Sequence, residues 1–161
     1  MFKTKSYLLI ALTFSLIWVG NAQTNKKMET NFNSQQKEVY STIEKMVIAF
    51  ESKDIDGVLS TYEKNAIVMF EPGKPITGHN ELRQAFTQFV NFNPNYTFSS
   101  HEVYISGDIA THIAPWNMVG TLPDGNKIEQ NGLSVAILRR QTDGSWLMIQ
   151  DNPHGQFRLN N

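Results

Sequence analysis

The chain has 161 residues, of which 40% are hydrophobic and 18% are charged. These values are typical of a globular protein with one core, and the length leaves too little chain for two domains of ordinary size. The formal net charge is −1 and there is no basic stripe, so nucleic acid is not indicated as a partner. The absence of cysteine excludes disulfides, thiol catalysis and thiolate metal sites.

The first 22 residues are typical of a secretory signal peptide. A lysine-bearing start is followed by an apolar run over residues 7–19, which is short for a membrane span. Gly20 and Ala22 then place small residues where signal cleavage requires them. We expect residues 1–22 to be removed and the protein to be periplasmic or secreted, with no membrane partner after cleavage. The alternative is an uncleaved segment that anchors the chain in the membrane.

The remaining chain divides by composition into three parts. Residues 23–33 are polar and predict a flexible leader. Residues 34–154 carry the periodic apolar pattern of one folded domain, and residues 155–161 are left as a C-terminal tail.

Three segments of this domain have apolar residues at helical spacing. The first runs from Ser34, whose side chain can cap a helix, to about Lys53. The second follows a cap at Asp54, and the third opens at His79 or Asn80. Their apolar faces comprise Val39, Ile43, Met46, Val47 and Phe50 in the first, Ile55, Val58, Leu59 and Tyr62 in the second, and Leu82, Ala85, Phe86, Phe89 and Val90 in the third.

Strands are predicted between and after these helices. A short apolar run at 66–70 ends before Pro72, Gly73 and Pro75, which stop it from continuing within a sheet. After residue 95 the period changes to two, as in strands. The later predicted strands are 96–99, 103–105, 109–122, 127–140 and 146–152, with turns at 106–108, 123–126 and 142–145.

This order of elements predicts an α+β domain. We expect three N-terminal helices to pack on a strongly curved, mostly antiparallel sheet, which gives a cone-shaped barrel with an open mouth. Phe86 and Phe89 of the third helix are large enough to wall a cavity inside that cone.

Several short motifs, taken in order, resemble the nuclear transport factor 2-like (NTF2-like) superfamily. They are Lys53-Asp54-Ile55-Asp56-Gly57-Val58, Ala66-Ile67-Val68-Met69-Phe70-Glu71-Pro72, Gly78 with the helix to Phe86, Asp143-Gly144-Ser145-Trp146, and Asp151. The chain looks most similar to the SnoaL-like and ketosteroid-isomerase-like branch, with its DUF4440-type domains, over roughly Ser34 to Pro153. The resemblance implies a cone fold that holds a small-molecule ligand in an internal pocket. The superfamily also hosts isomerases, cyclases, dehydratases and assembly domains, so the fold alone does not name a function.

The resemblance to ketosteroid isomerases is incomplete at the residues that carry their chemistry. Glu71 falls where those enzymes have their catalytic carboxylate. Their oxyanion hole uses a tyrosine on the first helix and a protonated aspartate on a late strand. Met46 occupies the tyrosine position and the aspartate position falls within residues 134–136, so neither donor is carried over. Because this stabilisation is usually the largest catalytic contribution, the resemblance argues against steroid isomerisation.

Two carboxylates are candidate catalytic residues. Glu71 stands where an apolar strand ends, and Asp151 ends a later strand on which Leu147 and Ile149 would share its face. Either carboxyl can act as a general acid or base when apolar surroundings raise its pKa. The alternative for Glu71 is a solvated surface acid, and the alternative for Asp151 is a structural partner of nearby polar groups.

Four residues are candidate substrate-binding residues. His112 and Trp116 lie four positions apart on one strand, so they share a face, which lies either inside the cone or outside it. Tyr62 is expected in the core with its hydroxyl reaching the cavity. Asn131 shares a face with the apolar residues 133, 135 and 137, and is either a hydrogen-bonding residue of the pocket or the solvated end of that face.

Nothing in the sequence predicts a metal or another cofactor. The histidines at positions 79, 101, 112 and 154 lack the spacing of metal ligands. A glycine-rich phosphate loop and the Gly-Xaa-Ser-Xaa-Gly motif of serine hydrolases are also absent.

Two functions are therefore open. In the first, the chain is an exported, non-catalytic domain that binds a small apolar or mixed ligand and forms a homodimer through the outer face of its sheet. In the second, it is a cofactor-independent isomerase, cyclase or dehydratase that uses Glu71 or Asp151 for proton transfer. The missing oxyanion donors favour the first.

Overall fold

The computed structural model describes residues 31–159. The predicted signal peptide and nearly all of the predicted leader lie outside the described residues. The described chain forms the helices α1 (Ser34–Glu51), α2 (Ile55–Leu59) and α3 (His79–Phe89), and the strands β1 (Tyr62–Glu71), β2 (Lys74–Thr77), β3 (Asn95–Phe98), β4 (Glu102–Ser106), β5 (Ile109–Thr121), β6 (Lys127–Arg140) and β7 (Trp146–Asn152). Short 3-10 helices follow α3 and β7, at Val90–Phe92 and Gly155–Leu159.

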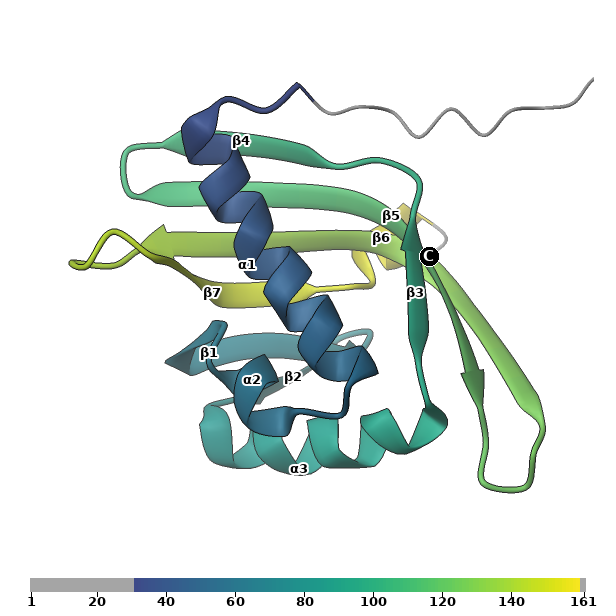
Figure 1. Cartoon of the computed structure of the whole chain (residues 1–161). Helices are drawn as coiled ribbons and strands as arrows, with labels where there is room; N and C mark the ends of the chain where they lie inside the picture. Colours follow the sequence, from purple (N-terminus) through teal and green to yellow (C-terminus); the bar gives the residue numbers. More distant parts are fainter. Residues whose placement is uncertain (1–30, 160–161) are drawn as a thin grey trace, which may run out of the picture.

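The strands form one curved sheet against which the helices pack (Figure 1). Their order is β2-β1-β7-β6-β5-β3, and β4 also pairs with β5. Only the β1–β7 pair is parallel among the described pairs. The predicted α+β fold, with three helices on a strongly curved and mostly antiparallel sheet, is confirmed, although the sheet stays open rather than closing into a barrel. No helix within residues 31–159 is both long and apolar enough to cross a membrane.

Helix α1 begins one residue earlier than predicted, because Asn33 rather than Ser34 caps it. The Asn33 side chain accepts a hydrogen bond from the Gln36 N–H at 3.0 Å, and the Gln36 side chain accepts one from the Asn33 N–H at 3.0 Å. This reciprocal capping box satisfies two N–H groups that the helix itself leaves without partners. From that start, α1 lies across the sheet and buries Val39, Ile43 and Phe50 (Figure 1).

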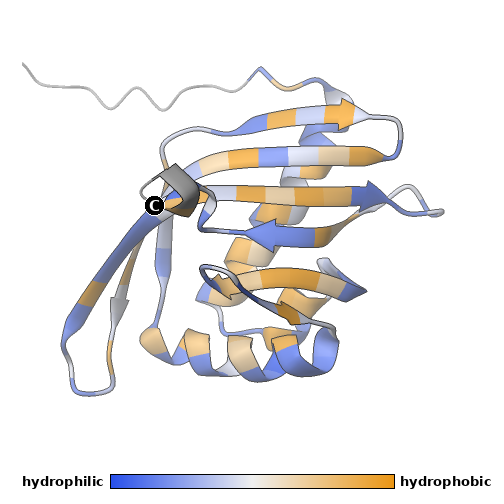
Figure 2. Cartoon of the chain, turned by 180° about the vertical axis from the view of Figure 1, so that it is seen from behind, coloured by the Kyte–Doolittle hydropathy of each residue, from blue (hydrophilic) through white to orange (hydrophobic). Residues whose placement is uncertain are grey.

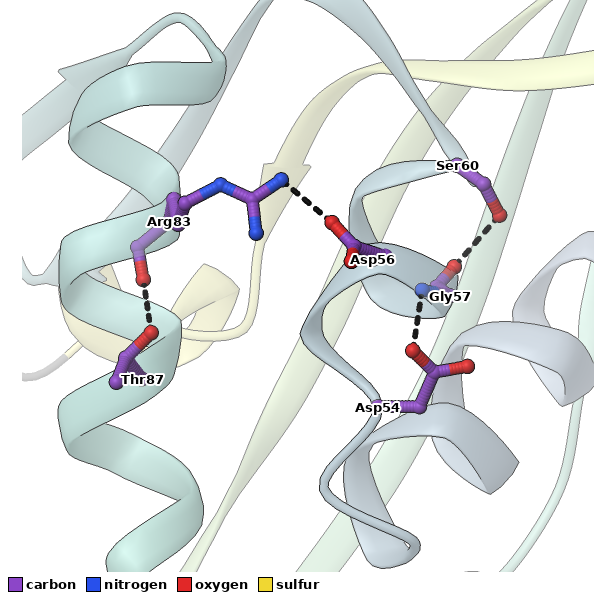
Figure 3. Close-up of polar contacts among 6 residues, drawn as sticks. All are labelled: Asp54, Asp56, Gly57, Ser60, Arg83 and Thr87. Atoms are coloured by element: carbon purple, nitrogen blue, oxygen red, sulfur yellow. Dashed lines mark hydrogen bonds and ion pairs between the residues drawn. The ribbon is translucent and has the colours of Figure 1, made fainter.

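The short helix α2 is held by local capping and by α3. Asp54 accepts a hydrogen bond from the Gly57 N–H at 2.9 Å, which confirms the predicted cap. Arg83 of α3 reaches Asp56 at 2.6 Å across the surface (Figure 3). Tyr62, expected at the end of this helix, instead begins β1, because α2 already ends at Leu59.

Strand β1 ends in a tight hairpin that the sequence only partly predicts. The chain turns at Gly73, whose φ of 75° suits glycine, and returns as β2. Pro75 lies within β2, opposite Met69. A proline is tolerated there because β2 is the edge strand of the sheet, where one side of the backbone has no ladder partner.

The two faces of β5 differ sharply in burial. Ala110, His112, Ala114, Trp116 and Met118 are all buried, whereas the residues between them are half-buried or exposed. The buried residues face α1, so the predicted His112–Trp116 face is the inner one. Figure 2 views the sheet from behind and shows hydrophobic and hydrophilic residues interspersed along its strands.

The core lies between the inner face of the sheet and the helices. Phe86 of α3 is at its centre, with ring centroids 4.9 Å from Phe50, 5.0 Å from Phe70 and 5.6 Å from Tyr62. This cluster joins α1, β1 and α3, and it supports one wall of the cavity described next.

Candidate functional site

An internal cavity of about 110 Å³ lies between α1, α3, β3 and the inner face of the sheet. Its deep part is formed by buried residues such as Val68, Phe86 and Met148. Its outer part includes half-buried Tyr96 and exposed Gln130, so the cavity opens to solvent on the side of β3 and β6. The polar groups in the lining are Tyr62, Tyr96, Trp116, Gln130, Ser134, Asp151 and His154, and the remaining lining residues are apolar.

A β-bulge in β7 brings Asp151 to this cavity. Leu138 of β6 pairs with Met148, but the next residue, Ile137, pairs with Gln150, so Ile149 is one extra residue on β7. The extra residue reverses the alternation beyond it, and bulges commonly re-aim side chains in this way. Asp151 therefore shares the inner face with Met148.

The predicted sharing of a face by Asp151, Leu147 and Ile149 is consequently wrong. Period-two counting assumes an uninterrupted strand, and the bulge breaks it. Asp151 instead lies beside Ala136 on one neighbouring strand and Val68 on the other, and both of these residues also line the cavity.

The carboxyl group of Asp151 is buried and hydrogen-bonded. Only 8% of the residue is exposed, and the Tyr62 hydroxyl donates to Oδ2 at 2.9 Å. Burial raises the pKa of Asp151 above its ordinary value, while hydrogen bonds from Tyr62 and Ser134 and the nearby His154 oppose that rise. Burial therefore favours the protonated form of this carboxyl more than exposure to solvent would.

Two tyrosines beside Asp151 remain hydrogen-bond donors over the physiological pH range. Burial, followed by the charge of Asp151, raises the pKa of Tyr62 well above its usual value. The same two causes, in the same order, raise the pKa of Tyr96. Both hydroxyls thus stay protonated, and that of Tyr62 is committed to the carboxylate.

The chain after β7 forms one rim of the cavity and is fastened to three strands. Trp116 Nε1 donates to the Pro153 carbonyl at 2.9 Å, and His154 Nε2 lies 3.0 Å from the Phe70 carbonyl. A carbonyl only accepts, so His154 Nε2 carries a proton. Gly132 permits this close packing, because a Cβ there would lie 2.6 Å from the Pro153 oxygen.

Glu71, the other candidate catalytic residue, does not line the cavity. It ends β1 at the hairpin, where its side chain is 65% exposed and forms an ion pair with Lys74. The hydrogen bond and charge of Lys74 lower the pKa of Glu71. The structure thus separates the two carboxylates, and only Asp151 meets the cavity.

The four predicted binding residues fall in different places. Tyr62 and Trp116 line the cavity. His112 is buried on the same face as Trp116 but outside the lining, where its Nε2 lies 3.0 Å from His101 Nδ1. Burial, together with His101, lowers the pKa of His112 to about 3, so it stays neutral. Asn131 is exposed on the outer face, away from the cavity.

Sequence reasoning missed several lining residues for which a signal existed. Once His112 and Trp116 are assigned to the inner face of β5, the antiparallel register places Ser134 opposite Ala114. Gln130 is opposite Met118 in the same register, so it also belongs to the inner face. Tyr96 pairs with Met118 from the other side. Once the inner face of β5 is known, strand pairing places all three residues on that face. The sequence did not decide which face of β5 is the inner one.

The arrangement provides an apolar space with one titratable carboxyl group and several hydroxyl donors. It can enclose an apolar molecule, hold one polar group against Asp151, and exchange a proton with it. Residues 31–159 contain no group of three or more histidine, aspartate or glutamate side chains placed to hold a metal ion.

A comparison of the sequence with known protein families finds a match. The sequence profile of the SnoaL-like domain matches residues 43–147. No curated protein sequence matches the chain.

Many solved structures share the fold at low sequence identity. A ketosteroid isomerase-like protein from Erwinia carotovora atroseptica has a TM-score of 0.64 and 23% identity, with 75% of this chain and 95% of that chain covered. An NTF2-like superfamily protein from Salmonella enterica has a TM-score of 0.67 and 10% identity, with 73% and 88% covered. An NTF2-like protein from Pseudomonas putida has a TM-score of 0.62 and 16% identity, with 73% and 83% covered. These likenesses confirm the resemblance to the NTF2-like superfamily at the level of the fold.

Proposed function

We propose that this chain, which belongs to the SnoaL-like domain family, binds a small and largely apolar molecule in the cavity beside Asp151. The observation that carries this proposal is the lining itself, in which aromatic and aliphatic side chains surround one buried carboxyl group. Small-molecule sites are typically apolar cavities with a few placed polar groups that orient the ligand. Asp151, Tyr96 and Ser134 are the groups that would do so here.

The volume limits the size of the buried part of the ligand. An engineered protein cavity of about 150 Å³ binds benzene. The cavity here, at about 110 Å³, is somewhat smaller. A single small ring or a compact branched group therefore fits inside, and any longer part of the ligand would extend past Gln130 toward solvent.

Filling the cavity tests the binding proposal. Ala136→Leu adds bulk on the inner face of β6, and Asn131→Leu adds it at an exposed position of the outer face as a matched control. Saturation-transfer NMR with benzyl alcohol and cyclohexanone should detect binding to the wild type and the control, and much weaker binding to Ala136→Leu. Absence of binding to the wild type, or equal binding to all three proteins, would contradict the proposal.

A second candidate function is proton transfer by Asp151, favoured by its burial and raised pKa. In this reaction the Asp151 carboxylate removes a proton from carbon next to a carbonyl group of the bound substrate and returns it at another position. Glu71 is not proposed as the base, because it lies outside the cavity. Any turnover that is found should be abolished in Asp151→Asn and retained in Glu71→Gln, and turnover that survives Asp151→Asn would exclude this function.

We also propose that a second copy of the chain covers the outer face of the sheet. Ile113, Leu133, Val135 and Ile137 lie half-buried on that face, opposite the face that packs on α1. Contiguous apolar surface of this kind commonly marks a protein interface. Sedimentation equilibrium should give the mass of a dimer, and Val135→Lys should shift it to that of a monomer. A wild-type protein that sediments as a monomer would refute the proposed dimer.

Export remains part of the proposed function. It is supported by the composition of residues 1–22, which lie outside the described residues. Mass spectrometry of the protein from its native host should find an N-terminus at Gln23. An intact Met1 in the mature protein would contradict export by cleavage.

A further inference from the structure

We infer that the molecule held in this cavity is a small organic cation of the ammonium class, with its charged head against Asp151. The inference rests on the proposed function, since it names the ligand class of the same cavity. It follows from the charge of the lining, from its aromatic character and from its size.

The first step is that no lysine or arginine stands beside Asp151. The lining contains this one carboxylate and neither lysine nor arginine. Hydroxyl groups of Tyr62 and Ser134 solvate the carboxyl, and His154 lies close enough to favour its charge. Among the described residues, the ion pairs are Lys74–Glu71, Arg83–Asp56 and Arg139–Glu63, all on the surface. Buried charges in proteins are normally paired, so a ligand cation would supply the partner that the chain does not.

The second step is what the aromatic residues offer to a ligand. The Trp116 N–H is already bound to the Pro153 carbonyl, and the Tyr62 hydroxyl is already bound to Asp151. Their polar ends are occupied, so they present mainly their rings to the cavity. Phe70, Phe89 and Tyr96 add further rings to the lining. Aromatic rings attract ammonium groups through the negative charge of their faces, and cages of such rings are used to bind quaternary ammonium ligands.

The third step is selection by charge and size. A ligand anion would be repelled by the Asp151 carboxylate, because the mostly apolar lining screens charge weakly. A neutral ligand of the same shape would gain the apolar contacts but would leave the carboxylate without a counter-ion. A trimethylammonium group is compact, apolar at its surface and positively charged, and it suits a cavity of about 110 Å³.

This ligand class implies that binding releases protons. Burial raises the pKa of Asp151, and a cation beside it would lower that pKa again. The other titratable groups that face Asp151 are Tyr62 of β1, Tyr96 of β3 and His154 of the following segment. Both tyrosines stay neutral, so the affinity for a cation should rise as pH increases through the pKa of Asp151.

Choline and its uncharged carbon isostere, 3,3-dimethyl-1-butanol, provide the direct test. Isothermal titration of the full chain at pH 8 should show choline binding about tenfold or more tightly than the alcohol. Asp151→Asn should remove this preference while retaining the alcohol affinity within about twofold. Glu71→Gln removes one carboxylate outside the cavity and should leave both affinities unchanged.

A second measurement on the wild type keeps the test independent of whether Asp151→Asn folds. The choline affinity should fall as pH is lowered from 8 to 5 in the wild type and also in His154→Gln, which removes the other chargeable group beside Asp151, whereas the alcohol affinity should not. Alcohol binding equal to or tighter than choline binding, or a choline affinity independent of pH, would overturn the inference and leave the proposed binding function standing. If neither these compounds nor the neutral rings bind, the proposed function fails and this inference fails with it.

Discussion

The two ends of the neighbouring parallel strands β1 and β7 each carry a carboxylate, and the structure treats them in opposite ways. Glu71 ends β1 in a solvent-exposed hairpin and pairs with Lys74. Asp151, one residue before the end of β7, is buried in the cavity and accepts a hydrogen bond from Tyr62. Their pKa values move in opposite directions, down for Glu71 because of Lys74 and up for Asp151 because of burial.

The difference shows that a position at the end of a strand does not decide whether a carboxylate reaches the cavity. Strand β1 extends three residues beyond Val68, the partner of Asp151, and the last of them, Glu71, lies in an exposed hairpin. Strand β7 carries a bulge that turns Asp151 inward, under the cover of the helices. The same residue chemistry is therefore solvated in one place and desolvated in the other.

The largest expected effect is on the free energy of unfolding, and it concerns Phe86 in the core beside the cavity. Phe86→Ala removes a ring that contacts Phe50, Phe70 and Tyr62, so we expect a loss of about 3–5 kcal/mol in the free energy of unfolding. Urea denaturation followed by circular dichroism measures this loss. Tyr104→Ala removes an exposed ring from β4 and should leave the midpoint almost unchanged. Equal effects of the two changes would mean that Phe86 is not central to the core.

A smaller effect tests the hydrogen bond that distinguishes Asp151 from Glu71. Tyr62→Phe keeps the ring and removes the hydroxyl, which leaves a buried carboxylate oxygen without that donor. We expect a loss of about 1–3 kcal/mol at neutral pH. The pKa of Asp151 should rise further, because this hydrogen bond lowers it. Tyr104→Phe is the matched control, and an unchanged stability of Tyr62→Phe would contradict the assigned contact.

The pH dependence of Asp151→Asn tests the direction of the pKa shift. The pKa of Asp151 is raised in the folded state above its ordinary value of 3.8, so the folded protein binds this proton more tightly than the unfolded chain does. The resulting stability is fully present below pH 3.8 and is lost as pH rises through the folded-state pKa. Asp151→Asn should therefore gain stability relative to the wild type as pH increases to 7, as measured by urea midpoints across that range. A gain at low pH instead would show that the shift has the opposite sign.

The smallest expected effect belongs to Glu71→Gln and has the reverse sign. Lys74 lowers the pKa of Glu71 below its ordinary value of 4.5, so the stabilisation is present above that pH and is lost as pH falls through the folded-state pKa. Solvent screens this exposed pair, and we expect a barely measurable destabilisation at neutral pH that disappears in acid and at high salt. A large loss of stability would mean that Glu71 is less solvated than the structure indicates.

Local signals in the sequence fix most of the elements. The apolar spacing predicts α1 and α3, the Asp54 cap predicts the start of α2, and the turns predict β6 and β7 at the limits observed in the structure. Strand β2 was missed because Pro75 argues against a central strand, and nothing local shows that an edge position is available. The spacing, the cap and the turns depend only on residues that are close in the chain, so they can be recognised in the sequence.

The candidate site was predicted less completely, because it depends on which strand faces turn inward. The sequence points to Tyr62, Trp116 and Asp151, all of which line the cavity, and equally to Glu71, His112 and Asn131, which do not. Asn131 and Gln130 are adjacent polar residues on opposite faces of β6, and both are exposed, but only Gln130 lies on the face that lines the cavity. Local composition cannot make that choice when both faces carry apolar residues.

The sequence by itself therefore determined the order of the helices and of every strand except β2, the family and the presence of a carboxylate near the end of the last strand. The tertiary structure alone decided that this carboxylate points inward. The reason is the extra residue Ile149, which β7 accommodates only because β6 and β1 fix the register on both of its sides. A bulge is a property of paired strands, and it changes the face of Asp151 without leaving a pattern in the strand's own residues.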